Sequence, residues 1–276
     1  MGVNADSLIA FVGGGVMAEA FIRGMLKKGL ARPEEIIASD PLAGRRTSLS
    51  EKLGIRVSAS NLEAISGAGT VVLAVKPQVL GKVLRELSGS IAPSTLLLTF
   101  VAGARVEAIR QALGTKAIVR IMPNTPCQIG EGISAWTATA DTSAQQRERA
   151  RQIIAALGEE VYVENEEYLD MATALSGSGP AYVFLFVEAL IDAGVHMGFS
   201  RAVSEKLVLQ TVRGSAIFAQ SSGLHPAVLR NMVTSPGGTT AEALYRLEKG
   251  GFRAVLSRAV GAAYEKAKLL GELSKK

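Results

Sequence analysis

The chain has 276 residues, of which 48 % are hydrophobic and 20 % charged, so we expect two folded domains of ordinary size and exclude general disorder. The net charge of +5 comes from dispersed lysines and arginines without a basic run, which argues against a nucleic-acid partner and supports only a general attraction for anions. The single cysteine, Cys127, excludes an intrachain disulfide and a cysteine-based metal site, and we expect its thiol to be buried.

Apolar runs alternate with helical patterns through the first half of the chain. The runs predict strands at Leu8–Val12, Ile36–Ala38, Thr70–Val75, Leu96–Thr99, Ala117–Ile121, Ile133–Thr137 and Val161–Val163. The patterns between them predict helices at Val16–Lys28 (with Gly29 as its C-cap), Arg45–Leu53, Pro77–Leu87, Val106–Leu113 and Ala144–Leu157. This alternation predicts a Rossmann-type, doubly wound parallel sheet of the α/β class.

Strand patterns stop after about Asn165, and only helical patterns follow. They predict helices at Pro180–Met197, Arg201–Ala219, Pro226–Met232, Thr240–Lys249 and Phe252–Leu273. The change places a boundary between an α/β domain at 1–164 and an all-helical domain at 165–276. A small helical domain with this much apolar surface favours dimerisation.

The chain carries no sign of export, membrane insertion or metal binding. Residues 1–7 lack the segments of a signal peptide. The uncharged stretches Leu87–Ala104 and Met171–Val187 are interrupted by Pro, Gly and Ser, which is typical of buried elements rather than membrane spans. His196 and His225 have no metal-ligand spacing. We therefore expect a cytoplasmic protein with no membrane partner and no metal.

The sequence Gly13-Gly14-Gly15-Val16-Met17-Ala18 follows the first predicted strand and opens the first predicted helix. In this G-x-G-x-x-A pattern Gly13 permits a tight turn, Gly15 lets the backbone approach a pyrophosphate, and Ala18 keeps helix and strand close. The free N–H groups at the start of the helix attract phosphate. The motif therefore predicts a dinucleotide site in the first domain.

The residues after the second strand bear on the choice of dinucleotide. Asp40 would accept from the ribose 2′-hydroxyl of NADH, although it could instead cap a turn, with Pro41 directing it away. Ser39, with Arg45 or Arg46, could bind the 2′-phosphate of NADPH. We favour NADPH and keep NADH as the alternative.

Polar residues also follow other predicted strands, at the sheet edge where open α/β sheets bind ligands. Lys76, before the first helical residue Pro77, is placed to meet phosphate or ribose. Asn61 is either a helix N-cap or a nucleotide contact. Asn124 is a candidate polar group near the nicotinamide.

Two motifs mark the helical half. Leu175–Ala181 (LSGSGPA) places small residues ahead of a long apolar helix, which indicates close backbone approach to another helix or to a ligand. Val233–Thr240 (VTSPGGTT) is a Gly-rich loop with hydroxyls at the start of a helix, suited to one carboxylate, although a single Thr there could be a plain N-cap.

The order of G-x-G-x-x-A, AVKP, MPNTP, LSGSGPAY and TSPGGTT along nearly the whole chain resembles that of pyrroline-5-carboxylate reductases, and the last motif is the most specific. The resemblance implies NAD(P)H-dependent reduction of 1-pyrroline-5-carboxylate, a cyclic imino acid, to L-proline. It also implies an interdigitated homodimer built by the helical domain, often assembled into a decamer of five dimers.

The resemblance assigns site residues as well. It places the cofactor at Val12, Gly13, Gly14, Gly15, Val16, Met17, Ser39, Pro41, Asn61, Ala74, Val75, Lys76, Pro77, Phe100, Val101 and Ala102. It places the substrate at Ser235, Gly237, Gly238, Thr239 and Thr240, with Glu166 near the ring nitrogen. Phe100 departs from the family's pattern, which often has a small residue or Cys at that position.

Reduction of a protonated cyclic imine needs positioning of the hydride donor more than a strong acid. We expect Thr240 to hydrogen-bond the ring nitrogen, with Glu166 as the second candidate catalytic residue and water as a proton source. One alternative is a β-hydroxyacid dehydrogenase-like oxidoreductase, which would need a lysine that Ser178–His196 lacks. Another is a non-catalytic NADPH-binding protein, which would not need an intact TSPGGTT loop.

Overall fold

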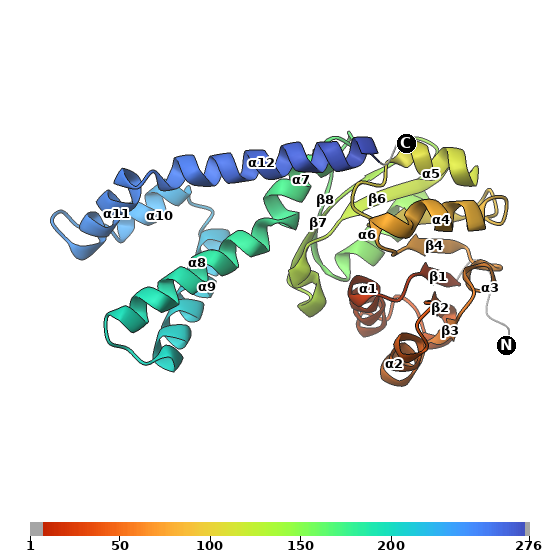
Figure 1. Cartoon of the computed structure of the whole chain (residues 1–276), viewed down its shortest axis with the longest axis horizontal. Coiled ribbons are helices and arrows are strands. Elements are labelled where there is room, and N and C mark those ends of the chain that lie inside the picture. Colours follow the sequence, from red (N-terminus) through yellow and green to blue (C-terminus); the bar gives the residue numbers. More distant parts are fainter. Residues whose placement is uncertain (1–7, 274–276) are drawn as a thin grey trace. The chain divides into compact units, whose positions relative to one another are not determined.

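The structure, a computed structural model, describes residues 8–273, so residues 1–7, which the signal-peptide expectation concerns, lie outside it (Figure 1). The chain divides into two compact units. The first comprises the residues up to Ser178 together with those from Ala263 onward, and the second is Gly179–Ala262. The boundary expected at 164/165 falls just after the last strand, before the short helix α7.

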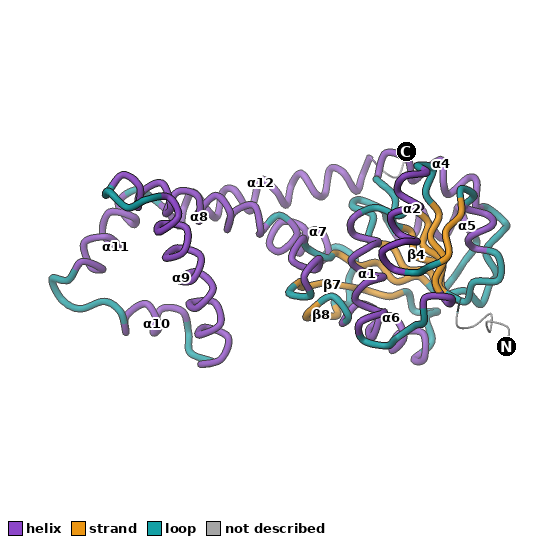
Figure 2. Tube along the Cα trace, turned by 90° about the horizontal axis from the view of Figure 1, so that it is seen from below, coloured by secondary structure: helices purple, strands orange, loops and turns teal. Residues whose placement is uncertain are grey.

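The first unit contains, in its described part, an eight-stranded sheet of order β3-β2-β1-β4-β5-β6-β7-β8. Its strands are orange in Figure 2. Its strands are β1 (Ile9–Val12), β2 (Ile36–Ser39), β3 (Arg56–Ser58), β4 (Thr70–Leu73), β5 (Leu96–Thr99), β6 (Ile118–Met122), β7 (Gly132–Ala138) and β8 (Gly158–Tyr162). The first six strands of this order, from β3 at the edge through β2, β1, β4 and β5 to β6, are parallel, as expected of a Rossmann-type sheet. The last two depart from the all-parallel prediction, because β7 pairs antiparallel with β6 and parallel with β8.

Helices cover both faces of this sheet, which explains why its strands are apolar throughout. Side chains alternate between the faces along each strand, so Phe11 and Ala10 of β1 belong to two different buried clusters. The cluster of Phe11 is completed by α1 (Val16–Lys27), α2 (Ala43–Leu53) and α6 (Ala144–Ala155). The cluster of Ala10 is completed by α3 (Asn61–Ile65), α4 (Pro77–Leu87) and α5 (Val106–Leu113).

The ends of α1 show how the sequence delimits an element. The helix stops at Lys27, and Lys28 rather than Gly29 is its C-cap. Gly29 follows with φ +65°, its N–H bonded to the carbonyl of Leu26, while the N–H of Leu30 bonds to that of Met25. This pair of bonds is a Schellman motif. Gly29 therefore helps to end the helix as expected, but it is the residue after the C-cap and not the C-cap itself.

Only helices follow β8, as predicted. A short helix α7 (Tyr168–Ala172) continues through the π-helical turn η4 (Thr173–Gly177). The second unit is built from α8 (Gly179–His196), α9 (Arg201–Ser222), α10 (Pro226–Met232), α11 (Thr239–Lys249) and the first part of α12 (Phe252–Leu273). Many of its large apolar side chains are exposed, among them Phe184, Leu185, Leu207 and Val255.

One helical stretch of the described chain, Tyr168–His196, is long and apolar enough to cross a membrane by length and composition alone. Apolar helices of soluble proteins meet the same criterion, so this is weak evidence for a membrane span.

Candidate active site

The glycine-rich turn joins β1 to α1 in a conformation that requires glycine. Gly13 has φ +101°, and a Cβ on it would lie 2.7 Å from the carbonyl oxygen of Ala74. Its N–H donates to the carbonyl of Ser39 at 2.9 Å. The turn is therefore fixed between the carboxyl ends of β2 and β4, as the cofactor motif predicts. Val12 ends β1, and Val16 and Met17 open α1.

The start of α1 is open in the way that a phosphate site requires. Gly15 is its N-cap, no side chain caps the helix, and a Cβ on Gly15 would meet nothing within 4 Å. By contrast, Ser60, Ser143 and Ser200 each accept a backbone N–H at the starts of α3, α6 and α9. The first-turn N–H groups of α1 thus have no side-chain acceptor and adjoin free space, which fits a pyrophosphate.

Asp40 acts as a turn cap in this structure. Its Oδ2 accepts the N–H of Gly14 at 3.1 Å, and its Oδ1 accepts the N–H of Leu42 at 2.9 Å. The carboxylate therefore ties the glycine-rich turn to the segment after β2, which is the capping alternative considered for this residue.

The two arginines of α2 have different surroundings. Arg45 donates to the carbonyl oxygens of the glycine-rich turn and pairs with Glu19 at 2.7 Å. Burial alone would raise the pKa of Glu19, but its bonds to Arg45 and Arg23 outweigh burial and lower that pKa. Arg46 donates through Nη1 to the carbonyls of Asp40 and the exposed Pro41, at 2.7 and 3.0 Å. Arg45 thus fixes the turn, while the other nitrogens of the Arg46 guanidinium form no hydrogen bond or ion pair within residues 8–273.

Ser39 and Asn61 meet at the ends of β2 and α3. The buried Ser39 hydroxyl donates to Asn61 Oδ1 at 2.7 Å, and Asn61 Nδ2 donates to Glu86 at 3.0 Å. The capping interpretation of Asn61 is wrong, because Ser60 precedes it as N-cap and accepts the N–H of Glu63. The two predicted cofactor residues therefore form one hydrogen-bonded pair beside the dinucleotide turn.

The exits of β4 and β5 lie on the same sheet edge. Lys76 is the exposed N-cap of α4, and Pro77 is its first residue, as expected; the preceding Ala74 and Val75 are partly buried. Phe100 stacks on Phe21 of α1, with ring centroids 4.8 Å apart and planes at 11°.

The stacking explains how the large Phe100 side chain is accommodated, because its ring packs on α1. Val101 after it is buried and Ala102 is exposed.

Asn124 follows β6 at the start of the short 3-10 helix η3 (Thr125–Ile129). Its Oδ1 accepts the N–H of Ile133 at 3.0 Å, which fixes the start of β7, and lies 3.8 Å from Cys127 Sγ. Cys127 is buried as expected, and burial raises the pKa of its thiol. Asn124 thus has a structural bond that the sequence did not suggest, and its Nδ2 makes no hydrogen bond to the described residues.

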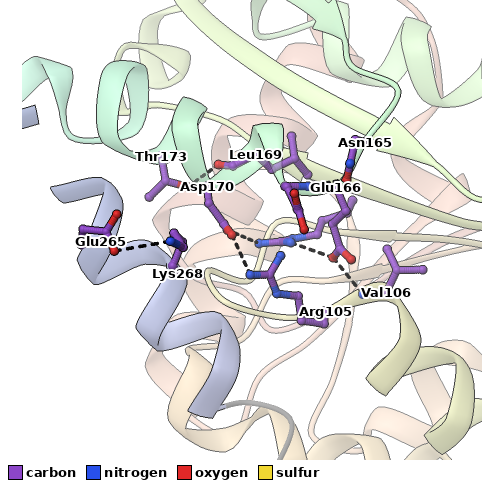
Figure 3. A network of polar contacts seen from close by, with 11 residues as sticks. Arg105, Val106, Asn165, Glu166, Leu169, Asp170, Thr173, Glu265 and Lys268 are labelled. Atoms are coloured by element: carbon purple, nitrogen blue, oxygen red, sulfur yellow. Dashed lines mark hydrogen bonds and ion pairs between the residues drawn. The ribbon is translucent and has the colours of Figure 1, made fainter. Parts of the chain in front are cut away.

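Glu166 belongs to a cluster of four charged side chains that we call the charge cluster: Arg105, Arg120, Glu166 and Asp170. Figure 3 labels Arg105, Glu166 and Asp170. Glu166 Oε1 accepts from Arg120 at 2.7 Å and from the N–H of Val106 at 2.9 Å. Asp170 lies 2.6 Å from Arg105 and 3.6 Å from Arg120. Sequence reasoning missed this cluster, although Arg120, a charged residue within an apolar strand, was a signal for it.

The LSGSGPA motif spans the end of the π-helical turn and the start of α8, and the N–H of Ser178 between them donates to the carbonyl of Thr173 at 2.8 Å. A Cβ on Gly177 would lie 2.6 Å from Met122 Cε. A close approach is therefore present at this motif, but the neighbour is the side chain that ends β6 and not another helix, as was expected. π-Helical turns occur frequently at functional sites.

The second unit carries its own open helix start. Gly238, not a threonine, is the N-cap of α11, and no side chain caps the helix, so the plain-cap alternative for the threonines is wrong. Gly237 has φ +68°, and a Cβ on Gly238 would lie 2.5 Å from Ser235 Oγ. Within the described chain the hydroxyls of Thr239 and Thr240 form no hydrogen bond. The loop thus offers free N–H groups and free hydroxyls at one place, as a carboxylate site requires.

Comparison with known proteins gives two family matches. The model described as pyrroline-5-carboxylate reductase dimerisation matches residues 166–270, and the model described as NADP oxidoreductase, coenzyme F420-dependent, matches residues 8–103. A pyrroline-5-carboxylate reductase of Synechocystis sp. is 42 % identical over 264 residues, covering 96 % of this chain and 98 % of that protein. One of Arabidopsis thaliana is 35 % identical and covers 98 % of both.

Solved structures agree with these relatives. A pyrroline-5-carboxylate reductase of Coxiella burnetii superposes with a TM-score of 0.89 at 35 % identity, covering 95 % of this chain and 97 % of that one. The Plasmodium falciparum pyrroline carboxylate reductase with NADP bound gives 0.86 at 34 % identity, covering 96 % and 98 %. Motif order, fold and full-length similarity all point to one assignment: this chain belongs to the pyrroline-5-carboxylate reductase family.

Proposed function

We propose that the protein reduces the C=N bond of 1-pyrroline-5-carboxylate with NADPH to give L-proline, the last step of proline biosynthesis. Family membership along nearly the whole chain and the NADP oxidoreductase match support this activity. The structural observation that carries it is a pair of open helix starts. Helices α1 and α11 both begin at a glycine, Gly15 and Gly238, with no capping side chain, so each presents free N–H groups to an anion.

The first open start fits the cofactor. NADPH, when bound, supplies the hydride. We assign its pyrophosphate to the backbone of Gly13–Met17 and its nicotinamide end to Phe100–Ala102 and Asn124, with Ala74–Pro77 beside it. Arg46 is our candidate for the 2′-phosphate, since a guanidinium binds phosphate through several donors. NADH lacks this phosphate, so we expect it to be the poorer donor.

The second open start fits the substrate. The free N–H groups of Thr239 and Thr240 hold the carboxylate, and Ser235 keeps the loop closed through its carbonyl, which accepts the N–H of Gly238 at 3.1 Å. We assign the hydrogen bond to the ring nitrogen to the Thr240 hydroxyl. Glu166 is the weaker candidate for this contact, because its Oε1 already accepts two hydrogen bonds.

The helical domain serves oligomerisation, as its family match implies. Its exposed apolar side chains, such as Phe184 and Leu185, need a covering surface. We propose a homodimer that assembles further into a decamer, located in the cytoplasm, without a membrane or nucleic-acid partner. Measurement of the native mass by light scattering tests the stoichiometry.

One assay tests the activity. The purified protein is incubated with 1-pyrroline-5-carboxylate and either NADPH or NADH, and loss of the reduced cofactor is followed together with proline formation. We expect turnover with both and higher kcat/KM with NADPH. NADPH binding without turnover would instead support a non-catalytic binding protein. In a separate assay with NADP⁺, formation of NADPH from a β-hydroxyacid, without any reduction of the imine, would support the dehydrogenase alternative.

A further inference from the structure

The loop Phe100–Arg105, which leads from β5 to α5, lies at the sheet edge that carries the glycine-rich turn, since β1, β4 and β5 are parallel. Its beginning is fixed by the stack of Phe100 on Phe21 and by a bond from the N–H of Val101 to Thr99 Oγ1 at 3.3 Å. Between the buried Val101 and Ala104, Ala102 is exposed. The loop therefore offers a short exposed tip at the ligand edge.

The end of this loop is held by two carboxylates from the segment around α7. The side chain of Arg105, the N-cap of α5, does not cap the helix. The Glu166 carboxylate takes over this role by accepting the N–H of Val106. A carboxylate at this position also complements the positive end of the helix dipole. Asp170 holds the Arg105 guanidinium at 2.6 Å. The last residue of the loop, Arg105, and the first residue of α5, Val106, are thus both held by carboxylates of the segment around α7.

Arg120 holds both of these carboxylates in place. It contacts Glu166 at 2.7 Å and Asp170 at 3.6 Å, and only 4 % of the Arg120 and Asp170 side chains is exposed. The charge cluster contains two positive and two negative groups. Since an unpaired buried charge is strongly unfavourable, the four side chains have few alternative arrangements.

The last turns of α12 cover the loop from another side. A Cβ on Gly103 would lie 3.2 Å from the carbonyl oxygen of Leu270, and a Cβ on Gly271 would collide with the Arg105 guanidinium. An added side chain would therefore crowd the loop against the helix at both glycines. The loop is therefore confined by α1, by the charge cluster and by α12.

We propose that the charge cluster positions the nicotinamide for hydride transfer by fixing the loop Phe100–Arg105, which makes Arg105, Arg120 and Asp170 positioning residues. This inference rests on the proposed function, which places the nicotinamide at this loop. The pyrophosphate is held elsewhere, by the glycine-rich turn. Release of the loop should therefore lower the rate of hydride transfer much more than the affinity for NADPH.

Gly271→Ala is the mildest way to release the loop. The new methyl group must displace the Arg105 guanidinium, the end of a flexible side chain, and alanine favours the helix that contains it. We expect kcat to fall roughly tenfold, as for a small misplacement of the reacting groups, with the Kd for NADPH changed by less than about threefold. The kinetic isotope effect of 4-deuterated NADPH on kcat should rise.

Gly81→Ala in α4 is the matched control, because its new Cβ would make only an ordinary contact of 3.7 Å, with Arg85. This control variant should leave kcat unchanged.

A second pair of variants separates charge from geometry. Arg105→Met should reproduce the effect of Gly271→Ala, and Arg105→Lys, which keeps a cation near Asp170, should recover part of the rate. If these variants lower the melting temperature but turn over normally per folded molecule, the cluster is only structural and the proposal is overturned.

The fluorescence lifetime of bound NADPH provides a readout that does not need turnover. A nicotinamide held rigidly should have a longer lifetime in the wild-type protein than in Gly271→Ala at equal occupancy. Absence of imine reduction by the wild-type protein would refute the proposed function while this comparison still tests positioning. Equal lifetimes together with equal kcat would refute the positioning role itself.

Discussion

The sharpest test of the proposed chemistry is Thr240→Val, which removes one hydroxyl and keeps the shape of the side chain. Thr240 is the second residue of α11, whose cap is Gly238, so the substitution removes no capping bond. Within residues 8–273 the hydroxyl has no hydrogen-bond partner to lose. Thr and Val have similar helix propensities, and the residue is only half-buried, so we expect the free energy of unfolding to change by less than about 0.5 kcal/mol.

The catalytic effect should be much larger than the effect on stability. One active-site hydrogen bond to a ring nitrogen that changes from iminium to amine contributes ~1.4–3 kcal/mol, which corresponds to a decrease in kcat/KM on the order of tenfold to a hundredfold. NADPH affinity should stay unchanged, because the cofactor is assigned to the other open helix start. Steady-state kinetics with 1-pyrroline-5-carboxylate, a thermal melt and a cofactor titration measure the three quantities.

Thr240→Ser is the matched control, since it keeps the hydroxyl and removes the methyl group. We expect it to retain most of the activity that the valine variant loses. Near-normal kcat/KM in Thr240→Val with a lowered melting temperature would show that the residue only stabilises α11, and the contact to the ring nitrogen would have to be sought at Glu166 or a water molecule.

Three further variants and one thiol reagent test the first domain. Gly15→Val should weaken NADPH and NADH binding in calorimetry while the melting temperature stays near that of the wild type, because the new side chain fills the open space of the phosphate site; unchanged affinity would contradict the assigned turn. Arg46→Ala should lower kcat/KM with NADPH, through a loss of roughly 1–3 kcal/mol of transition-state stabilisation, and leave kcat/KM with NADH unchanged. Arg45→Ala should lower kcat/KM with both cofactors. Equal effects of Arg46→Ala on both would exclude a 2′-phosphate contact. Cys127, whose pKa is raised by burial, should stay protonated at neutral pH, so a thiol reagent should label it quickly only after denaturation; rapid labelling of the folded protein would show that the thiol is accessible.

Local sequence patterns predicted the elements of this fold well where residues that begin or end an element, such as proline, mark its bounds. The predicted bounds of β5, α4, α5, α10 and α12 agree with the structure. Proline begins both α4 and α10, which fixes their first residue. Strand β3 was missed because it has three residues and only Ser58 is buried, so no apolar run marks it. The antiparallel direction of β7 was missed because pairing direction depends on distant strands rather than on local pattern.

In the candidate site, too, the parts formed by one contiguous segment could be predicted, and the parts formed by distant residues could not. The glycine-rich turn and the TSPGGTT loop were readable from the sequence because each is a contiguous segment whose glycines have local reasons, such as the positive φ of Gly13 and Gly237. The charge cluster joins residues between 46 and 65 positions apart, so no spacing rule indicates it. The capping role of Asp40, weighed as an alternative from the sequence, needed the three-dimensional turn to decide it.

The glycine contacts at the end of α12 have a practical consequence for making this protein. Because the Leu270 carbonyl and Gly271 lie against the loop after β5, a shortened C-terminus or a tag fused close to it would disturb the loop to which we assign the nicotinamide rather than a remote surface. Preparations with an N-terminal tag or none are therefore the proper reference for kinetics, and a low kcat from a C-terminally altered preparation should not be attributed to the natural enzyme.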